Sequence, residues 1–369
     1  MFIYDLEQIN NLFKLHSGKR IAITTHENPD GDGLATSLAL YYCLDKIYQA
    51  EPYIIIDSVF PTFLDFLNYQ HCRIMDFEEY KKVFIDKFEL LVVLDCHEED
   101  RVDTVNEIFL YSKKVLVIDH HEAKKKFIKE EYLYYLDNDA VSTGVMLHRI
   151  IESVKLKNYI ANDLLNTNNE TKPINTSSFV KDYVDCIYTS ILNDTDNFVN
   201  SNAKRETFLV VADLIDMGLE THIIVNQFLN KKPIFYYKFI GDVLSTIKLN
   251  KNKKIVYYVS TLKMLRDNHQ DIESYSKMMR WTKGAYDVEV QVLFQEYENN
   301  VWRISLRSDL YDVSQMAQYF GGGGHKKASG FQLEGNFNFV KKNVISFIEE
   351  QIKKSPSSNE GHIDDEEKY

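Results

Sequence analysis

The sequence predicts an α/β protein whose N-terminal region folds around a parallel β-sheet. Apolar, β-branched runs alternate with stretches of helical spacing, which is the pattern of a parallel sheet with right-handed crossovers. Four apolar stretches also end directly in acidic residues or histidines, and open α/β proteins build their sites at the carboxyl edge of the sheet. One such ending means little, but four together suggest a convergent metal site.

The expected elements of this region follow in chain order. The strands cover residues 21–25, 53–57, 91–95, 115–119 and 132–136. The first helices cover residues 5–16, 34–47, 61–69, 102–109 and 142–154. A polar stretch at 155–180 is interpreted as a loop insertion. After it, the expected helices cover residues 182–192, 204–217, 221–229 and 233–247.

A smaller α/β domain is expected to follow, joined by a helical linker, with the active site in the cleft between the two domains. The expected domains are residues 1–245 and 246–354, followed by an acidic, polar tail at 355–369 that is predicted to be disordered. The expected elements of the second domain cover residues 255–260 (strand), 271–281 (helix), 288–296 and 301–307 (hairpin), 313–320 (helix), 331–333 (strand) and 337–353 (helix).

Composition limits the function. The chain has 369 residues and a formal charge of −12, so binding of long duplex nucleic acid, which requires broad phosphate neutralisation, is not expected. The four cysteines are far apart and form no Cys-x-x-Cys pair, so a reducing compartment is expected, without structural zinc or a disulfide framework. No signal-peptide pattern and no apolar run of about eighteen residues occur, so we expect a cytoplasmic protein without a membrane span.

The side chains that follow the apolar stretches are metal-ligand types: His26, Asp30, Asp32, Asp95, Asp119, His120, His121 and Asp194. An oxygen-rich set with some nitrogen suits Mn(II), Mg(II) or Co(II) better than a thiolate zinc site does. So many acids would repel one another without cations, which favours two metals and a bridging carboxylate. Helix capping by Asp30 and an Asx turn at Asp194 are the alternative interpretation. Two adjacent histidines at a strand end do not fit it.

These residues stand in the motif order of a known family. The sequence resembles the DHH phosphoesterases, which are named for the triplet found here as Asp119-His120-His121. The other family motifs are matched, in order, by residues 26–32, Asp95, residues 193–195 and the glycine-rich residues 321–330. The last of these resembles the signature of the DHH-associated C-terminal domain. Within the family, the arrangement is most similar to the short, two-domain branch.

The resemblance implies a role for each candidate. It implies that two manganese ions bind, with Mg²⁺ or Co²⁺ as alternatives. The ligands of one ion would be His26, Asp30 and Asp95, and those of the other would be Asp32, Asp95, His120 and Asp194. His121 would contact the scissile phosphate or assist the leaving oxygen. Asp119 would orient a histidine by accepting its other N–H.

A second constellation lies in the C-terminal domain. Successive glycines before His325 offer backbone N–H groups for an anion nest, and Arg307 can bind a phosphate bidentately. The expected substrate-binding residues are Arg307, Ser308, Gly322, Gly323, Gly324 and His325. A flexible glycine turn is the alternative interpretation of this segment.

The leading interpretation is a manganese-dependent phosphoesterase that hydrolyses short oligoribonucleotides and dinucleotides such as pApA, and also pAp to AMP. The alternatives are a cyclic di-AMP phosphodiesterase, a single-strand exonuclease, an inorganic pyrophosphatase and an inactive nucleotide sensor. The expected partners are a short RNA, dinucleotide or nucleotide phosphate, with no membrane and no long duplex. A homodimer is left open.

Overall fold

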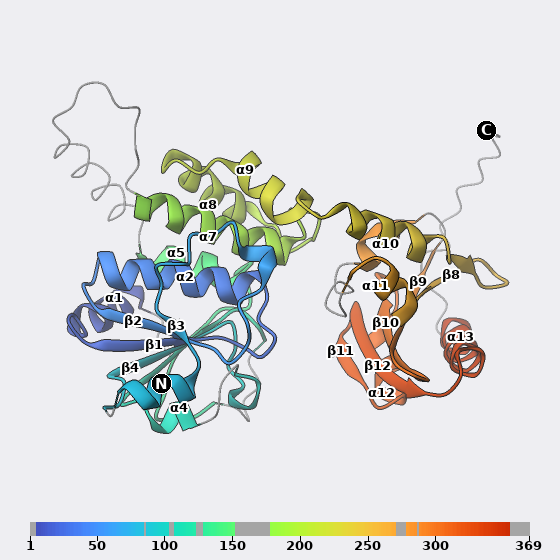
Figure 1. Ribbon diagram of the computed structural model, residues 1–369, viewed down its shortest axis with the longest axis horizontal. Coiled ribbons are helices and arrows are strands. Elements are labelled where there is room, and N and C mark those ends of the chain that lie inside the picture. The colour runs from blue at the N-terminus through green and yellow to red at the C-terminus, as the bar shows by residue number, and fades with distance from the viewer. Residues whose placement is uncertain are drawn as a thin grey trace. The chain divides into compact units, whose positions relative to one another are not determined.

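The computed structural model describes residues 5–84, 86–102, 107–122, 128–151, 178–270, 278–285 and 288–354 (Figure 1). The chain divides into two compact units, Met1–Lys231 and Lys232–Tyr369, and each is described by itself. Most of the expected insertion at 155–180, and all of the expected tail at 355–369, lie outside the described residues. Among the described helices, none is long and apolar enough to cross a membrane.

The first unit is built on a six-stranded sheet whose strand pairs are all parallel. Its strands are β1 (Arg20–Thr24), β2 (Glu51–Ile55), β3 (Ile74–Met75), β4 (Leu90–Leu94), β5 (Val115–Asp119) and β6 (Leu133–Leu136). The strand order is β3-β2-β1-β4-β5-β6, so the chain reverses its direction of progress between β1 and β4. Doubly wound sheets place their sites at such a switch point. The predicted parallel α/β fold is confirmed.

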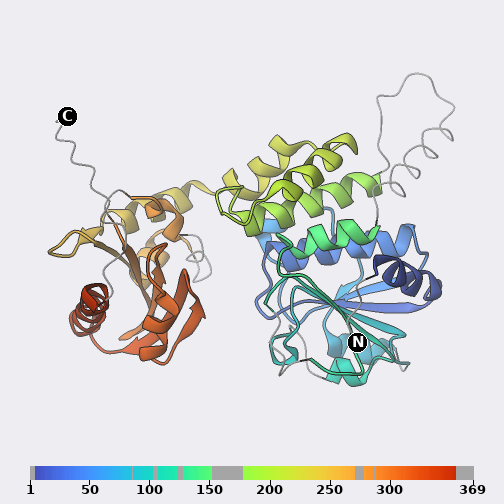
Figure 2. The same cartoon turned by 180° about the vertical axis from the view of Figure 1, so that it is seen from behind.

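Alternating side chains of the sheet support helices on both faces (Figures 1 and 2). On β1, Ile21 and Ile23 join one apolar core, whereas Ala22 joins the other. The larger core holds α1 (Leu6–Leu15), α2 (Gly31–Lys46), α5 (Thr143–Ile151) and α7 (Ser178–Thr195). The opposite face is covered by α3 (Phe77–Val83) and α4 (Glu107–Leu110). Both cores fix the strand ends that carry the candidate ligands.

The described part of this unit also contains a 3₁₀ turn, η2 (Glu99–Arg101), the helices α8 (Arg205–Asp216) and α9 (Thr221–Val225), and a π-helical turn, η4 (Asn226–Asn230). The helix predicted at 61–69 is wrong, because only a 3₁₀ turn forms there, η1 (Thr62–Leu64). Its aromatic spacing instead lets Phe63, Phe66 and Tyr69 pack on the larger core from an irregular segment. The sequence also missed β3 and α3, which follow that segment.

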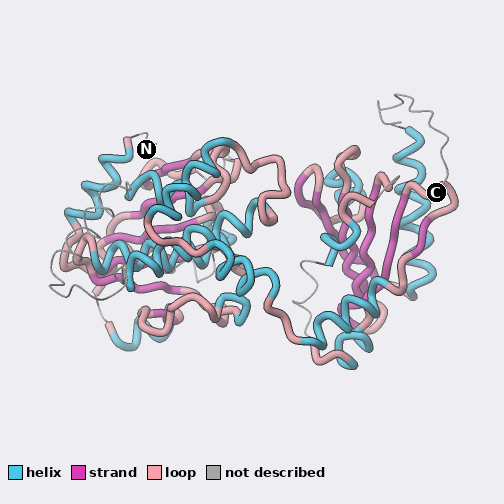
Figure 3. The backbone as a smooth tube through the Cα atoms, turned by 90° about the horizontal axis from the view of Figure 1, so that it is seen from above, coloured by secondary structure: helices cyan, strands magenta, loops and turns pink. Residues whose placement is uncertain are grey.

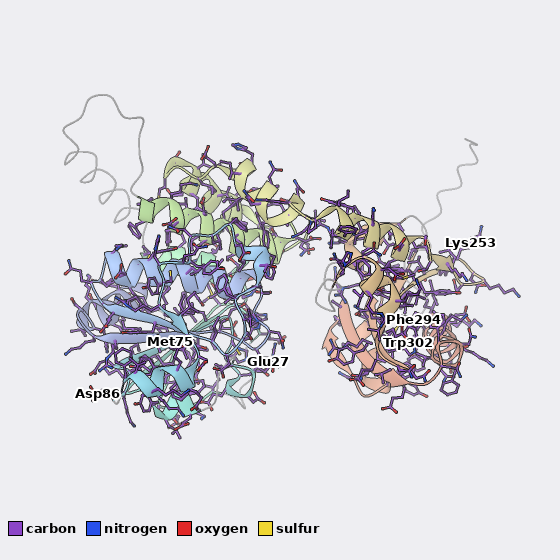
Figure 4. All side chains as sticks on the ribbon, viewed as in Figure 1. Glu27, Met75, Asp86, Lys253, Phe294 and Trp302 are labelled. Atoms are coloured by element: carbon purple, nitrogen blue, oxygen red, sulfur yellow. The ribbon has the colours of Figure 1, made fainter. Side chains whose placement is uncertain are left out.

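The second unit contains another six-stranded sheet, of order β11-β12-β10-β9-β8-β7 (Figure 3). Its strands are β7 (Lys248–Leu249), β8 (Ile255–Ser260), β9 (Val290–Glu298), β10 (Val301–Arg307), β11 (Gly323–His325) and β12 (Ala328–Glu334). β8 and β9 are parallel, and the other pairs are antiparallel. On one face, Phe294 and Trp302, labelled in Figure 4, both pack against Phe337.

That face carries α12 (Val313–Tyr319) and α13 (Phe337–Lys354). The other face carries α10 (Ile234–Leu244), α11 (Leu262–Asp267) and a 3₁₀ turn, η6 (Met278–Thr282). Because α10 buries its apolar side in this core, the second unit begins before α10, whereas the sequence placed the domain boundary after it. Of the helix expected at 271–281, the described part is η6.

Candidate metal centre

The loop after β1 is shaped by the start of α2. Asp30 caps this helix, and its Oδ1 atom accepts the backbone N–H groups of Asp32 (2.9 Å) and Gly33 (3.3 Å). Gly33 is required by a close approach, because a Cβ there would lie 2.3 Å from Thr25 Oγ1. Asp30 can therefore cap the helix and also serve as a candidate metal ligand. The Oδ1 atom that caps α2 lies 3.8 Å from His26 Nε2.

Asp95 stands at the centre of the cluster. It follows β4 directly and takes φ +60°, in the left-handed region that is unusual for a non-glycine residue. Its N–H donates to the carbonyl of Ile118 on β5 (2.9 Å). The local strain turns a buried carboxylate toward three imidazoles: its oxygens lie 3.4 Å from His26 Nε2, 3.4 Å from His120 Nε2 and 3.5 Å from His121 Nδ1.

Two groups of candidate metal donors meet around Asp95. His26, Asp30 and Asp95 form one group whose ligand atoms all lie within 4.8 Å of one another. Asp32, His120 and Asp194 form another by the same measure. His120 Nε2 lies 3.1 Å from Asp194 Oδ2 and 3.7 Å from Asp32 Oδ2.

These separations fit divalent cations. Ligand atoms at right angles around an ion with bonds of about 2.1 Å lie roughly 3 Å apart. The four histidine–carboxylate pairs of these groups lie 3.1–3.8 Å apart in the structure, close to this value. Carboxylates with imidazole suit Mn(II)-type ions, and no cysteine thiol belongs to these groups among the described residues. The residues therefore fit two neighbouring metal ions.

Asp32 is fixed by α5, which sequence reasoning missed. The backbone N–H of Thr143 donates to Asp32 Oδ2 (2.8 Å), and that of Gly144 donates to Oδ1 (3.2 Å). Both come from the first turn of α5, where free N–H groups and the helix dipole favour an anion. Thr36 Oγ1 also donates to Asp32 (3.0 Å), and Thr143 Oγ1 donates to Asp95 (3.1 Å). The carboxylates thus keep their geometry without help from an ion.

Asn193 fixes two further ligands. Its side-chain amide donates to Asp30 Oδ2 (2.9 Å) and to Asp194 Oδ1 (3.0 Å). Asp194 lies in the last turn of α7, so this amide ties the end of α7 to the start of α2. The triplet Asn193-Asp194-Thr195 matches a family motif, but that pattern does not indicate the role of the Asn193 amide.

Asp119 lies behind the cluster and is fully buried. Its Oδ1 atom accepts the side-chain N–H of His121 (2.8 Å) and the backbone N–H of the same residue (3.1 Å). Its Oδ2 atom lies 2.5 Å from Nδ1 of His97, a buried histidine that sequence reasoning missed. The sequence contained a signal for this residue, because His97 comes two residues after the candidate ligand Asp95. Asp119 thus contacts two imidazoles, as the orienting role predicted for it requires.

The electrostatics show how strongly this site attracts positive charge. Burial lowers the pKa of His26, but the Asp30 and Asp95 carboxylates outweigh it and raise the pKa to about 11. Burial also opposes the charge of His120, yet Asp194 and Asp95 raise its pKa to about 12. Burial and the neighbouring carboxylates raise the pKa of Asp32. The acids hold protons on nearby groups, and bound cations would replace those protons.

The second unit meets the sequence expectations only in part. Arg307 ends β10 and is half-buried, and burial lowers its pKa. Ser308 is corrected: its hydroxyl donates to the Glu289 carbonyl (2.7 Å) and accepts the N–H groups of Leu310 (3.1 Å) and Tyr311 (3.0 Å). Those contacts occupy its donor and its acceptors, so Ser308 shapes a turn and has no donor left for a phosphate.

The glycine segment is a helix cap followed by a hairpin. Gly321 has φ +80°, and the N–H of Gly322 donates to the Ala317 carbonyl (2.9 Å), which is a Schellman cap of α12. The expected nest donor Gly322 is therefore corrected, because its N–H is already bonded. Gly323 and Gly324 lie in β11, which pairs with β12. His325 ends that strand, and its side chain lies outside what the structure describes.

The fold and the donor set define the class of protein: a doubly wound α/β unit with a candidate site for two divalent cations, followed by a second α/β unit. Comparison with known families narrows this class. Residues 20–191 match the DHH family, N-terminal domain, and residues 251–354 match the DHHA1 domain. The chain therefore carries a DHH domain followed by a DHHA1 domain, and it is a hydrolase that acts on phosphoester bonds.

Curated relatives share most of the chain. The chain is similar to the bifunctional oligoribonuclease and PAP phosphatase NrnA of Thermus thermophilus, with 28% identity over 90% of this chain and 90% of the relative. The NrnA protein of Bacillus subtilis is 22% identical over 85% of this chain and 89% of the relative. Among solved structures, an exopolyphosphatase-related protein of Bacteroides fragilis superposes with a TM-score of 0.76 at 21% identity, covering 95% of each chain. That likeness supports the fold.

Proposed function

We propose that this protein is a manganese-dependent phosphoesterase that cleaves short oligoribonucleotides and dinucleotides such as pApA to mononucleotides, and pAp to AMP. The observation that carries the proposal is the pair of donor groups joined around Asp95 at the switch point of the sheet. The relatives named as bifunctional oligoribonuclease and PAP phosphatase support this substrate class. We place the activity in the cytoplasm.

The residues around the candidate metal site would have three different roles: metal binding, contact with the scissile phosphate, and orientation of His121. Bound divalent ions would supply Lewis-acid activation of water and of a phosphoryl oxygen. His26, Asp30, Asp32, Asp95, His120 and Asp194 would hold them. His121 is the exposed member of the triplet, with a side chain 43% accessible, so it is the group that contacts the scissile phosphate. Asp119 holds His121 through Nδ1, which leaves Nε2 to face the substrate.

The second unit would bind the part of the substrate away from the reacting phosphorus. Arg307 supplies a guanidinium that can pair with a phosphate. Gly323, Gly324 and His325 form the short strand β11 and offer a backbone edge close to α12. We propose that these residues select short substrates. The proposal does not assign this role to Ser308 and Gly322, because their hydrogen-bonding groups are used within this unit.

A hydrolysis panel tests the proposal. The purified protein, loaded with Mn(II), is given pApA, pAp, a five-nucleotide RNA, cyclic di-AMP and pyrophosphate. We expect pApA, pAp and short RNA to be hydrolysed faster than the other two. Preference for cyclic di-AMP or pyrophosphate would replace the proposed substrate, and no cleavage of any compound would contradict the proposal.

Two variants tie the activity to the site. His120→Ala removes a ligand that lies 3.1 Å from Asp194 and should abolish hydrolysis of all substrates. His222→Ala changes an exposed histidine in α9 and should leave hydrolysis unchanged. Equal activity of the two variants would show that the chemistry occurs elsewhere.

A further inference from the structure

The second unit exposes aromatic and basic side chains on α10 and η6. Phe235 and Tyr237 of α10 are 39% and 43% exposed, and Trp281 of η6 is 49% exposed. The basic residues beside them are Lys232, Lys238 and Arg280. We call this set of six residues the α10–η6 surface. It lies outside both the candidate metal centre and the glycine segment.

The aromatic groups of this surface are held in place. Met278 and Met279 of η6 are buried in the core beneath it, so that Arg280 and Trp281 face outward. Thr282 ends the turn, and its carbonyl accepts the side-chain amide of Gln291 (2.9 Å). A rigid aromatic side chain loses little entropy when a ligand stacks on it.

The two elements meet at Tyr236. Burial raises the pKa of Tyr236, and a hydrogen bond from Trp281 together with the charge of Arg280 opposes that shift. Tyr236 also packs edge-on against Tyr237, with ring centroids 5.7 Å apart. Trp281 and Tyr237 therefore both contact Tyr236, which is partly buried, and both are themselves exposed to solvent.

The basic groups are kept close together. Burial lowers the pKa of Lys232, and the nearby charge of Arg280 lowers it further. Lys238 lies over the Phe235 ring, 5.1 Å from its centroid. Within the described chain, neither Arg280 nor Lys238 forms an ion pair, and the one acid of α10, Asp242, accepts a hydrogen bond from Asn268 (2.8 Å). In a chain of net charge −12, such a local excess of cations favours an anionic ligand.

We propose that the α10–η6 surface binds single-stranded RNA. Phosphates would pair with Arg280 and Lys232, and bases would stack on Trp281 and Tyr237. Aromatic platforms beside cations are the general means by which proteins hold single strands without reading sequence. A protein ligand is less favoured, because adjacent cations flanked by stacking faces match the alternation of phosphate and base. The proposal takes RNA as ligand from the proposed function and assigns a contact beyond hydrolysis itself.

Tryptophan fluorescence tests the binding directly. The chain has two tryptophans, and Trp302 is only 6% exposed, so ligand-dependent changes report on Trp281. The full-length protein, kept in EDTA to prevent hydrolysis, is titrated with a twelve-nucleotide oligo(A). We expect saturable quenching that weakens with added salt. Trp281→Phe should remove the signal, and Arg280→Glu should weaken binding at least tenfold.

Arg303→Glu is the matched control. Arg303 is an exposed arginine on β10 of the same unit, and it lies over the Tyr297 ring, 4.0 Å from its centroid. This variant should bind the RNA as the unchanged protein does. Equal loss in both arginine variants, absence of saturable quenching, or equally strong competition by polyglutamate would each overturn the proposal.

Hydrolysis separates this proposal from the proposed function. Arg280→Glu should cleave pApA at the normal rate, yet require at least fivefold more of a twelve-nucleotide RNA to reach half-maximal rate. The unchanged protein could bind RNA through Trp281 and yet hydrolyse no substrate. That result would contradict the proposed function and support the RNA-binding surface. If Arg280→Glu is normal on both substrates and in binding, the surface proposal fails alone.

Discussion

His97 Nδ1 lies 2.5 Å from Asp119 Oδ2, and both side chains are buried behind the candidate metal centre. The other oxygen of Asp119 accepts two N–H groups of His121. His97 therefore prevents the carboxylate from rotating, and the carboxylate in turn fixes the imidazole of His121. Burial opposes the charged form of Asp119, but its bonds to His121 and His97 lower the pKa below its usual value. Asp119 stays an acceptor for both histidines.

Replacement of His97 should reduce turnover. In His97→Ala, Asp119 loses one of its partners and His121 becomes less well oriented, so kcat should fall by about 10- to 100-fold, as is typical for residues that orient the groups of a metal site. KM should change little, because His97 does not face the substrate. His97→Asn, which can still donate an N–H, should recover part of kcat. Steady-state kinetics on pApA measures this, and an unchanged kcat in His97→Ala would contradict it.

Thr143 should control metal affinity. Its hydroxyl donates to Asp95 (3.1 Å), which belongs to the donor group of His26 and lies 3.4 Å from His120 of the other group. In Thr143→Val the volume is kept and this bond is lost, so the affinity for Mn(II) should fall by about tenfold. Thr143→Ser keeps the hydroxyl and serves as the control. Calorimetric titration with Mn(II) gives both values, and equal affinities for the two variants would show that the hydroxyl does not matter.

The candidate metal ligands could be predicted from the sequence because each follows an apolar stretch. Strand ends meet at one edge, so His26, Asp95 and His120 could be placed together without coordinates. The residues that hold them could not be found this way. Thr143 acts partly through its backbone N–H, and every residue has one. The partner of that N–H depends on how the start of α5 faces the loop after β1, a tertiary relation that no local pattern encodes.

The errors in the fold have a similar origin. Residues 61–69 have helical spacing of aromatics, but their side chains are used to cover a core from an irregular segment. The glycine segment at 321–324 was read as an anion nest, since several glycines together are compatible with many turns. Its conformation is decided by α12, which needs Gly321 as a cap, and by β12, which pairs with the next residues.

Arg149 should be the most important ion-pairing residue for the stability of the first unit. Its guanidinium donates two hydrogen bonds of 2.6 Å to Glu206 and a third of 2.6 Å to Asp137. Arg149→Met leaves two partly buried carboxylates without their partner and should lower the free energy of unfolding by about 2–3 kcal/mol. Arg149→Lys should restore only part of this, because an ammonium cannot pair bidentately.

Urea unfolding gives these values, and an exposed pair supplies the control. Lys113 contacts Glu89 at 2.8 Å with 56% of its side chain accessible. Lys113→Met should change the free energy of unfolding by less than about 1 kcal/mol. If Arg149→Met lowered the free energy of unfolding by no more than this, the ion pairs of Arg149 with Glu206 and Asp137 would add little to stability.

Gly33 and Gly241 should respond oppositely to alanine. A Cβ on Gly33 would lie 2.3 Å from Thr25 Oγ1 and 3.4 Å from His26 Nε2, so Gly33→Ala should displace the start of α2 and weaken Mn(II) binding. A Cβ on Gly241, within α10, would meet nothing within 4 Å. Gly241→Ala should therefore stabilise the second unit by about 0.5–1 kcal/mol. Thermal unfolding and metal titration of both variants measure these effects.

Asp95 should decide how many metal ions bind. It belongs to the donor group of His26 and also contacts His120 of the other group, so it is the residue on which both depend. Calorimetric titration of the unchanged protein should detect two Mn(II) ions. His26→Ala should remove one of them, because Asp32, His120 and Asp194 remain in place. Asp95→Asn should weaken both, since an amide oxygen carries no net charge to bridge two cations.

The same titration can be followed through stability. A metal ion that binds only the folded state raises the free energy of unfolding. At a hundred times its Kd, Mn(II) should therefore stabilise the unchanged protein by about 2.7 kcal/mol for each site. His26→Ala should keep part of this gain, and Asp95→Asn should lose nearly all of it. His222→Ala should behave as the unchanged protein. Binding of a single ion to the unchanged protein, or loss of only one ion in Asp95→Asn, would contradict a shared bridging carboxylate.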